Sequence, residues 1–547
     1  MQSLLKTQFR YFFPVCFFGM CVNLLYLSLP VYIMVVYDKV LISFSIETLT
    51  NLTIGVLIAL AAMGILDYFR SRIMIQAGTD LEEKMITPIL TFMLKDAALQ
   101  TGRGYERGLQ DLGMLKNSIA EETFFRLPDL PWIAVYIAVL FFMHTTLALI
   151  VLTGIVTSFI FQFFLRLLIK KRYVLSDIIL FSGNRSISEY LDHAETISGM
   201  GMAQGIIKKY TGMHMEAIKL DYDAAAYKAG IKSVIKTINT ITATAVFGAG
   251  VHLYFANEIT SGIMMAAIPV TLRLFYPLVE SLHTLKASIE AAAAYKRIRT
   301  YINTSQSRAT FTLPAPQGKI SIEKMTFVLK GKTLLQNISF SVEPGETLGI
   351  VGPSGSGKTV LLKLLLGIWP ATAGKVKIDE SEISQWQNEE LGKYVGYHPQ
   401  NTELFSGRID ENIAGFKTVV PENIIEAAKK AGAHEMILQL PDGYNTWMEK
   451  QGKNLSGGQR KIISTARALY NNPPIVVMDE PHAGLDEIGL KLLLQTMLEL
   501  KKEKTTLIIV TDRINLLRNT DKILVMNDKQ AVSFGASHEI MKQYKIQ

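Results

Sequence analysis

The chain has 547 residues, more than the roughly 250 to 300 residues at which a single hydrophobic core stops growing, so at least two domains are expected. Its composition is 49% hydrophobic and only 19% charged, with a mean hydropathy of +0.24, which favours a membrane protein. The net charge is +8, but Lys and Arg are interspersed with Asp and Glu, which argues against a nucleic-acid partner and indicates loops beside anionic lipid.

Apolar segments in the first half of the chain predict membrane-spanning helices, because crossing a bilayer takes about 20 residues as a helix. The six segments cover residues 12–36, 50–69, 130–145, 147–168, 235–256 and 260–278. The second half of the sequence has no comparable segment, so residues 1–303 are predicted to form an α-helical membrane domain of six helices. Both cysteines, Cys16 and Cys21, lie in the first segment, which gives no disulfide framework and no metal-ligand spacing.

Basic residues predict the orientation of these helices, since the cytosolic ends of membrane helices are enriched in Lys and Arg. They flank the first, second and fourth segments at Lys6, Arg10, Arg70, Arg72, Lys170, Lys171 and Arg172. We therefore expect a multi-pass protein whose second domain lies in the cytoplasm. Polar stretches after the second and fourth segments predict long helical extensions below the membrane, with contact tips near residues 102–112 and 200–205.

A second domain is expected to follow a linker. Pro and Gly residues at 313–318 punctuate the chain, so we place the linker at residues 304–318 and the second domain at residues 319–547. Short β-rich apolar runs at 347–351, 475–478 and 506–511 alternate with helical stretches there. This alternation predicts an α/β fold.

A P-loop pattern, Gly-Pro-Ser-Gly-Ser-Gly-Lys-Thr, lies between the predicted strand 347–351 and a predicted helix, 360–366. Its glycines let backbone N–H groups wrap phosphates at a helix N-terminus, where the helix dipole also favours anions. Lys358 is expected to reach the β- and γ-phosphates and Thr359 to hold Mg²⁺. The predicted nucleotide-binding residues are Gly352, Pro353, Ser354, Gly355, Ser356, Gly357, Lys358, Thr359 and Val360.

The predicted strand 475–478 delivers two carboxylates at its end, Asp479 and Glu480. With a P-loop upstream, Asp479 is expected to orient Mg²⁺. Glu480 is expected to act as the base, or to position water, for in-line attack on the γ-phosphate. The sequence therefore predicts an ATPase that uses ATP and Mg²⁺, in an α/β P-loop domain.

The segment Leu-Ser-Gly-Gly-Gln-Arg at 455–460 resembles the signature motif of ABC ATPases. It is a second glycine-rich helix N-terminus, able to offer backbone donors and the Ser456 hydroxyl to a phosphate. In that family the signature motif completes the nucleotide site of the opposite subunit, so the resemblance implies a homodimer of half-transporters. It assigns nucleotide contacts to Ser456, Gly457, Gly458 and Gln459. It also implies that Gln400 senses Mg²⁺ and the attacking water, and that Asp486 lies in the loop that crosses the dimer.

Two residues depart from the ABC pattern. Asp512 stands where the family places a histidine that binds the γ-phosphate. A carboxylate there would be repelled by about 4 kcal/mol per charge pair at about 4 Å in a dielectric of about 20, so Asp512 must turn away, carry a proton or act through water. Leu329 stands where an aromatic residue usually stacks on adenine, which predicts weaker base affinity. We expect slow but real hydrolysis, with Asp512 at a catalytic position.

Several segments of the membrane half resemble transporters of type 1 protein secretion, specifically the PrtD-like exporters of metalloproteases and repeat-in-toxin proteins. These segments are Tyr32–Leu41 with Tyr37, Asp129-Leu-Pro-Trp132, Ala194–Glu195 and Met200-Gly-Met202. The resemblance implies export of an unfolded protein with a C-terminal signal across the bacterial inner membrane. It also implies an inner-membrane adaptor protein and an outer-membrane channel as partners.

Alternatives remain open for the membrane half. Tyr37 and Trp132 could serve only as interfacial packing residues and Pro131 as a first-turn helix residue. Arg273 in the sixth segment either faces a substrate path or reaches the cytosolic surface. Only about ten residues precede the first segment, which predicts no N-terminal peptidase domain and an uncleaved cargo. The alternative functions are a lipid or multidrug exporter and a membrane-anchored ATP sensor without hydrolysis.

Overall fold

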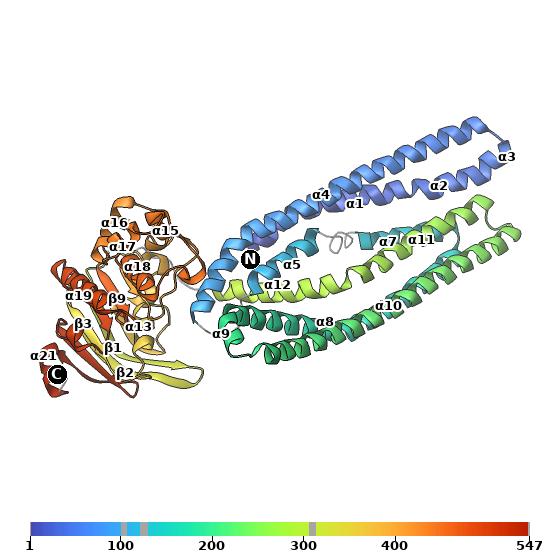
Figure 1. Ribbon diagram of the computed structural model, residues 1–547. Coiled ribbons are helices and arrows are strands. Elements are labelled where there is room, and N and C mark those ends of the chain that lie inside the picture. The colour runs from blue at the N-terminus through green and yellow to red at the C-terminus, as the bar shows by residue number, and fades with distance from the viewer. Residues whose placement is uncertain (1, 100–106, 121–128, 306–312, 545–547) are drawn as a thin grey trace. The chain divides into compact units, whose positions relative to one another are not determined.

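The computed structural model describes residues 2–99, 107–120, 129–305 and 313–544. The chain divides into two compact units, Met1–Gln306 and Ser307–Gln547, which we call the helical unit and the α/β unit. The boundary between them falls inside the predicted linker. Both predicted fold classes are confirmed, one in each unit (Figure 1).

Long helices dominate the helical unit. Its elements are α1 (Gln2–Tyr26), α2 (Ser28–Val35), the π-helical turn η1 (Val36–Val40), α3 (Leu41–Ser43), α4 (Ile46–Leu99), α5 (Gly108–Ala120), α7 (Leu130–Met143), α8 (Thr145–Asp192), α9 (Ala194–Gly199), α10 (Ala203–Phe255), α11 (Ser261–His283) and α12 (Leu285–Ser305). Helices α4, α8 and α10 continue far beyond their apolar segments, which confirms the predicted helical extensions. Helices α8 and α10 lie side by side over most of their length (Figure 1).

Five of the described helical stretches are long and apolar enough, by length and composition, to cross a membrane, and each matches one of the six predicted segments. They are Arg10–Ser43, Ile46–Leu99, Thr145–Asp192, Ala203–Phe255 and Ser261–His283. The third predicted segment, 130–145, forms the shorter apolar helix α7, whose 14 residues begin next to residues 121–128, which lie outside the described part of the chain. Pro131 lies in its first turn, where no helical N–H is needed, and His144 adopts an extended conformation that ends it.

The end of the first span is tied to the start of α11 through Asp38. Its carboxylate accepts hydrogen bonds from the Thr260 hydroxyl at 2.6 Å and from the Gly262 amide at 2.7 Å. A carboxylate is favoured there because helix N-termini carry unpaired N–H groups and partial positive charge. This residue of the Tyr32–Leu41 segment therefore has a structural role.

Asp111, inside the first predicted contact tip, is fully buried. Its two oxygens accept from Arg297 at 2.6 and 2.8 Å, which joins α5 to α12. This ion pair lies within the helical unit. Residues 102–106 of that tip lie outside the described residues, so its predicted contact stays a prediction. At the second tip Met200 is 70% exposed.

Two main sheets build the α/β unit. The six-stranded sheet has the order β12-β11-β3-β10-β9-β6, with only β12 antiparallel to its neighbour, and the four-stranded antiparallel sheet has the order β2-β1-β4-β5. The strands are β1 (Ile320–Leu329), β2 (Lys332–Val342), β3 (Thr347–Val351), β4 (Ala373–Ile378), β5 (Ser381–Glu382), β6 (Val395–His398), β7 (Gly407–Arg408), β8 (Trp447–Met448), β9 (Ile475–Asp479), β10 (Thr506–Val510), β11 (Lys522–Asn527) and β12 (Gln530–Ala536).

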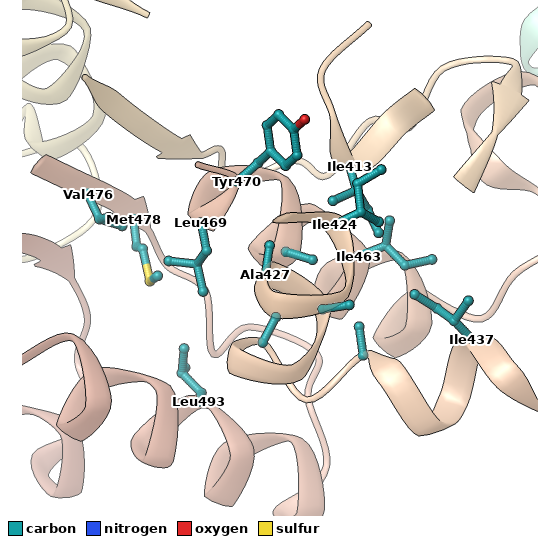
Figure 2. Packing of buried hydrophobic residues seen from close by; sticks show 14 of the residues in the cluster. Ile413, Ile424, Ala427, Ile437, Ile463, Leu469, Tyr470, Val476, Met478 and Leu493 are labelled. Atoms are coloured by element: carbon teal, nitrogen blue, oxygen red, sulfur yellow. The ribbon is translucent and has the colours of Figure 1, made fainter. Parts of the chain in front are cut away.

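The helices of this unit are mostly short. They are α13 (Lys358–Leu365), α14 (Asn388–Leu391), α15 (Ile409–Ile413), α16 (Pro421–Lys430), α17 (His434–Leu438), α18 (Gly457–Leu469), α19 (Glu487–Lys502), α20 (Ile514–Leu517) and α21 (Ser537–Gln543). Figure 2 shows the core where α16 and α18 pack beside β9, with Val476 and Met478 of β9 near Leu469 of α18. Because β9 is buried on both faces, it reads as a continuous apolar run in the sequence.

Candidate nucleotide site

The candidate site lies at one edge of the six-stranded sheet, where four neighbouring parallel strands end. Strand β3 leads into the P-loop, β10 leads to Asp512, β9 ends at Asp479 and β6 leads to Gln400. Val510 of β10 pairs with Ile350 on one side and with Asp479 on the other. The chain segments that follow these strands are therefore neighbours, as is common for ligand sites at the carboxyl ends of parallel strands.

The P-loop, residues 352–359, curls around the start of α13. Gly357 has φ +100, and a Cβ there would approach Leu335 to 2.5 Å, so only glycine fits. The first α-helical bond of α13 runs from Leu361 N to Gly357 O, so the amides in the first turn of α13 can bind an anion, whereas the Ser356 amide donates to the Pro353 carbonyl. The Lys358 ammonium donates to the Gly352 and Pro353 carbonyls at 2.7 and 3.0 Å, at the same loop.

Asp479 has the environment expected of a cation ligand. Its side chain is 1% exposed, and neither carboxylate oxygen has a hydrogen-bond partner among the described residues. Burial raises the pKa of Asp479, while the nearby Thr359 hydroxyl and the Lys358 ammonium oppose that shift. A buried carboxylate without partners is costly unless it meets a cation. The pair Asp479 and Thr359 therefore fits a bound Mg²⁺ by chemistry as well as by position.

Glu480 and Gln400 are joined directly. The Gln400 amide nitrogen donates to Glu480 Oε2 at 2.9 Å. Glu480 has φ +46, a left-handed conformation that non-glycine residues rarely adopt and that is often found at functional sites. Its amide donates to the Val510 carbonyl at 3.1 Å, which holds the strained turn against β10.

The signature segment caps α18. Ser456 Oγ accepts from the Gln459 amide at 3.2 Å, and Gln459 Oε1 accepts from the Ser456 amide at 2.9 Å, a reciprocal capping box. The Ser456 hydroxyl hydrogen takes no part in these two bonds. Gly457 is exposed and Gly458 is partly exposed, so this helix N-terminus can receive an anion.

Asp512 is hydrogen-bonded to a histidine that the sequence did not lead us to single out. Asp512 Oδ1 lies 2.8 Å from His482 Nε2, and the side-chain exposures are 87% and 7%. The structure shows the Asp512 carboxylate turned toward this buried imidazole, and the three alternatives for its relation to the γ-phosphate stay predictions. His482 follows Glu480 by two residues, and a histidine just beyond the two carboxylates was the one available signal in the sequence.

The other family positions have local structural roles. Asp486 caps α19, accepting from the Gly489 amide at 2.8 Å. Leu329 ends β1 and is half-buried beside a tight turn. The aromatic residue nearest to it in β1, Phe327, is 5% exposed and stacks on Trp369 with ring centroids 5.3 Å apart. Phe327 is therefore not free to replace the stacking aromatic that is missing at position 329.

Arg273 contacts the interior of the helical unit. Its guanidinium donates to Asn23 Oδ1 at 3.1 Å and lies 4.6 Å from the centre of the Tyr26 ring. Asn23 also donates to Asp129 at 2.9 Å, and Arg70 binds the other oxygen of Asp129 at 3.0 Å. Arg70, which we counted among the basic flanks of the second segment, is thus buried in an ion pair. A role of Arg273 in the substrate path stays a prediction.

Two family models match the chain. One, described as the ABC transporter transmembrane region, matches residues 12–278, and one described as ABC transporter matches residues 335–483. Among solved structures, the chain is similar to a bacterial Atm1-family ABC exporter with ATP bound, with a TM-score of 0.83, 20% identity, and coverage of 98% of this chain and 96% of that chain. At this identity the likeness shows the fold.

Curated relatives extend the match over nearly the whole chain. This chain is 30% identical over 532 residues to the type I secretion system ATP-binding protein PrsD of Rhizobium meliloti, and the match covers 95% of this chain and 90% of PrsD. It is 28% identical over 539 residues to the leukotoxin export ATP-binding protein LtxB of Aggregatibacter actinomycetemcomitans, covering 94% of this chain and 74% of LtxB. The chain therefore belongs to the ABC exporters, with a transmembrane region and an ABC ATPase domain in one polypeptide.

Proposed function

We propose that this exporter is the ATP-driven component of a type I protein secretion system. As a homodimer it hydrolyses ATP in the cytoplasm and moves an unfolded polypeptide across the bacterial inner membrane, with an adaptor and an outer-membrane channel as partners. The observation that carries the proposal is the similarity to PrsD over 95% of the chain, supported by LtxB, whose name states leukotoxin export. The segments around Tyr37 and Trp132 support the same class.

The chemistry follows from the site residues. The free amides of the P-loop and the Lys358 ammonium bind the triphosphate. Asp479 and Thr359 would hold Mg²⁺, which would supply positive charge to offset the negative charge of the triphosphate. Glu480 takes the proton of the attacking water, and Gln400 orients both the Glu480 carboxylate and that water. Asp512 adds negative charge to the same edge of the sheet, so hydrolysis is slow but real.

The first experiment measures phosphate release by the purified full-length protein. Glu480→Gln should lower turnover by about 100-fold or more while ATP binding persists, because general-base catalysis contributes about 10² to 10⁴. Glu499→Gln, an exposed glutamate on α19, is the matched control and should behave as wild type. Asp512→His removes the carboxylate charge together with the carboxylate that contacts His482, so turnover should change, and an unchanged rate would show that position 512 does not affect hydrolysis.

The second experiment identifies the cargo class in proteoliposomes. A C-terminal fragment of a secreted repeat protein should stimulate ATP turnover, whereas small hydrophobic compounds should not. Stimulation by the small compounds alone would favour a lipid or multidrug exporter, and no phosphate release by wild type would favour a sensor. Arg273→Ala should impair stimulation without reducing membrane insertion, with the exposed Arg72→Ala as its control.

A further inference from the structure

A histidine outside the predicted site connects two of its loops. His482 belongs to the segment that follows β9, and Asp512 to the segment that follows β10. The His482 ring is 7% exposed, with Nε2 2.8 Å from Asp512 Oδ1 and Nδ1 3.1 Å from the Thr511 hydroxyl. Both ring nitrogens are therefore engaged with the segment after β10.

The hydrogens in this group can be assigned from its chemistry. An ionised carboxylate only accepts, so His482 Nε2 carries the hydrogen, and Nδ1 of a neutral ring accepts from Thr511. The Thr511 oxygen in turn accepts from the Arg513 amide at 3.1 Å. Burial lowers the pKa of His482, with Asp512 and Glu480 opposing and Arg513 adding to the shift, which agrees with a neutral ring at pH 7. In this assignment Asp512 accepts from His482, His482 accepts from Thr511, and the Thr511 oxygen accepts from the Arg513 amide.

The group lies close to the catalytic edge. Thr511 N donates to the Ile350 carbonyl of β3 at 3.2 Å, and the Glu480 amide donates to the Val510 carbonyl at 3.1 Å. The turn after Glu480 is closed by further backbone bonds, Ala483 N to Glu480 O and Leu485 N to His482 O. A strained turn persists only where its surroundings hold it, and the buried His482 ring is the side chain that anchors this turn to β10.

We propose that His482 is a positioning residue for ATP turnover. It fixes the otherwise exposed Asp512 carboxylate and holds the turn that carries Glu480, so that the two loops move as one unit. The inference rests on the proposed ATPase function. It differs from a direct role of Asp512 in catalysis, because it assigns to Asp512 only the acceptance of the His482 hydrogen bond, and repulsion between the Asp512 charge and the nucleotide is a separate effect.

The test compares kcat and KM for ATP among variants of the full-length protein. His482→Ala and Asp512→Ala should each lower kcat about 10-fold or more with KM changed by about twofold or less, since small misplacement of a reacting group is expensive. Asp512→Asn keeps an acceptor oxygen and should retain most of the turnover. His482→Gln keeps a donor toward Asp512 and should recover part of the turnover that His482→Ala loses. The double alanine variant should be no worse than either single variant.

Controls separate positioning from folding and from the proposed function. Asp512 is 87% exposed at its side chain, so its replacement does not open the core. His434→Ala removes a histidine bonded to Tyr444 in the same domain and should leave kcat unchanged. Wild-type turnover in His482→Ala, an Asp512→Asn loss as large as that of Asp512→Ala, or multiplicative effects in the double variant would each overturn the inference. Absence of phosphate release by wild type would instead overturn the ATPase function itself.

Discussion

His398, the last residue of β6, is fully buried beside α18. Its Nδ1 lies 3.2 Å from the Ser464 hydroxyl. Burial lowers the pKa of His398 from 6.5 to about 3, and the charges of Lys461 and Arg467 add to the effect. The folded domain therefore keeps this ring neutral at pH values where the unfolded chain would protonate it.

This difference predicts an acid-sensitive ATPase domain. Because the folded pKa lies below the unfolded one, the stabilisation is complete above pH 6.5 and is lost as the pH falls toward 3, by about 1.4 kcal/mol per pH unit. The drop in the melting temperature of the domain between pH 7.5 and 5.5 should be smaller in His398→Gln than in wild type. His538→Gln, at a ring 83% exposed, should keep the wild-type drop, and equal drops in all three would refute the assignment.

At the scale of elements, residues far apart in sequence join the helices of the membrane region. Asp38 bonds the start of α11, and Asp129 bonds Arg70 of α4 and Asn23 of α1. Hydrogen bonds to charged groups contribute about 1.5 to 3 kcal/mol each, more than neutral ones. We expect these contacts to fix the register of the helices.

Replacing Asp38 tests that expectation. Asp38→Ala should destabilise the membrane region by about 2 to 3 kcal/mol, since it leaves the α11 N-terminus without its charged acceptor. Asp38→Asn keeps one acceptor oxygen and should lose less. Thermal unfolding in detergent measures both. Glu47→Ala, an exposed carboxylate in the first turn of α4, is the matched control, and a loss equal to that of Asp38→Ala would argue against the capping role.

The prediction from sequence succeeded where local pattern determines structure. Strands β3, β9 and β10 lie within one residue of their predicted bounds, because central parallel strands are buried on both faces and read as apolar runs. The pairs His482–Asp512 and Arg70–Asp129 were missed because they join residues brought together only by the fold. Helix α7 ends two residues before its predicted bound, because His144 adopts an extended conformation.

At the scale of the whole molecule, one chain carries one P-loop and one signature segment. If the nucleotide sites are shared in a homodimer, a defect in Lys358 and a defect in Ser456 damage the same site only when they lie on different chains. A dimer with Lys358→Ala on one chain and Ser456→Arg on the other keeps one intact site. Placing both changes on one chain damages both sites.

Purified mixed dimers with differently tagged chains test this sharing. The dimer with one change on each chain should retain about half of the wild-type phosphate release if the two sites act independently, and the dimer with both changes on one chain should retain almost none. Two homodimers, each carrying one of the changes, serve as inactive references. The reverse order, with almost no activity in the dimer that has one change on each chain and about half in the dimer that has both changes on one chain, would show that each chain completes its own site.

The bond between Asp38 and the start of α11 also sets a condition on biogenesis. Its partners are separated by 222 residues, Asp38 being made long before Thr260. At about 5 to 20 residues per second, synthesis leaves the carboxylate without these hydrogen-bond donors for about 10 to 45 s. During that interval the first span must be held by α4 or by the insertion machinery, so the membrane region can close only when nearly all of it has left the ribosome.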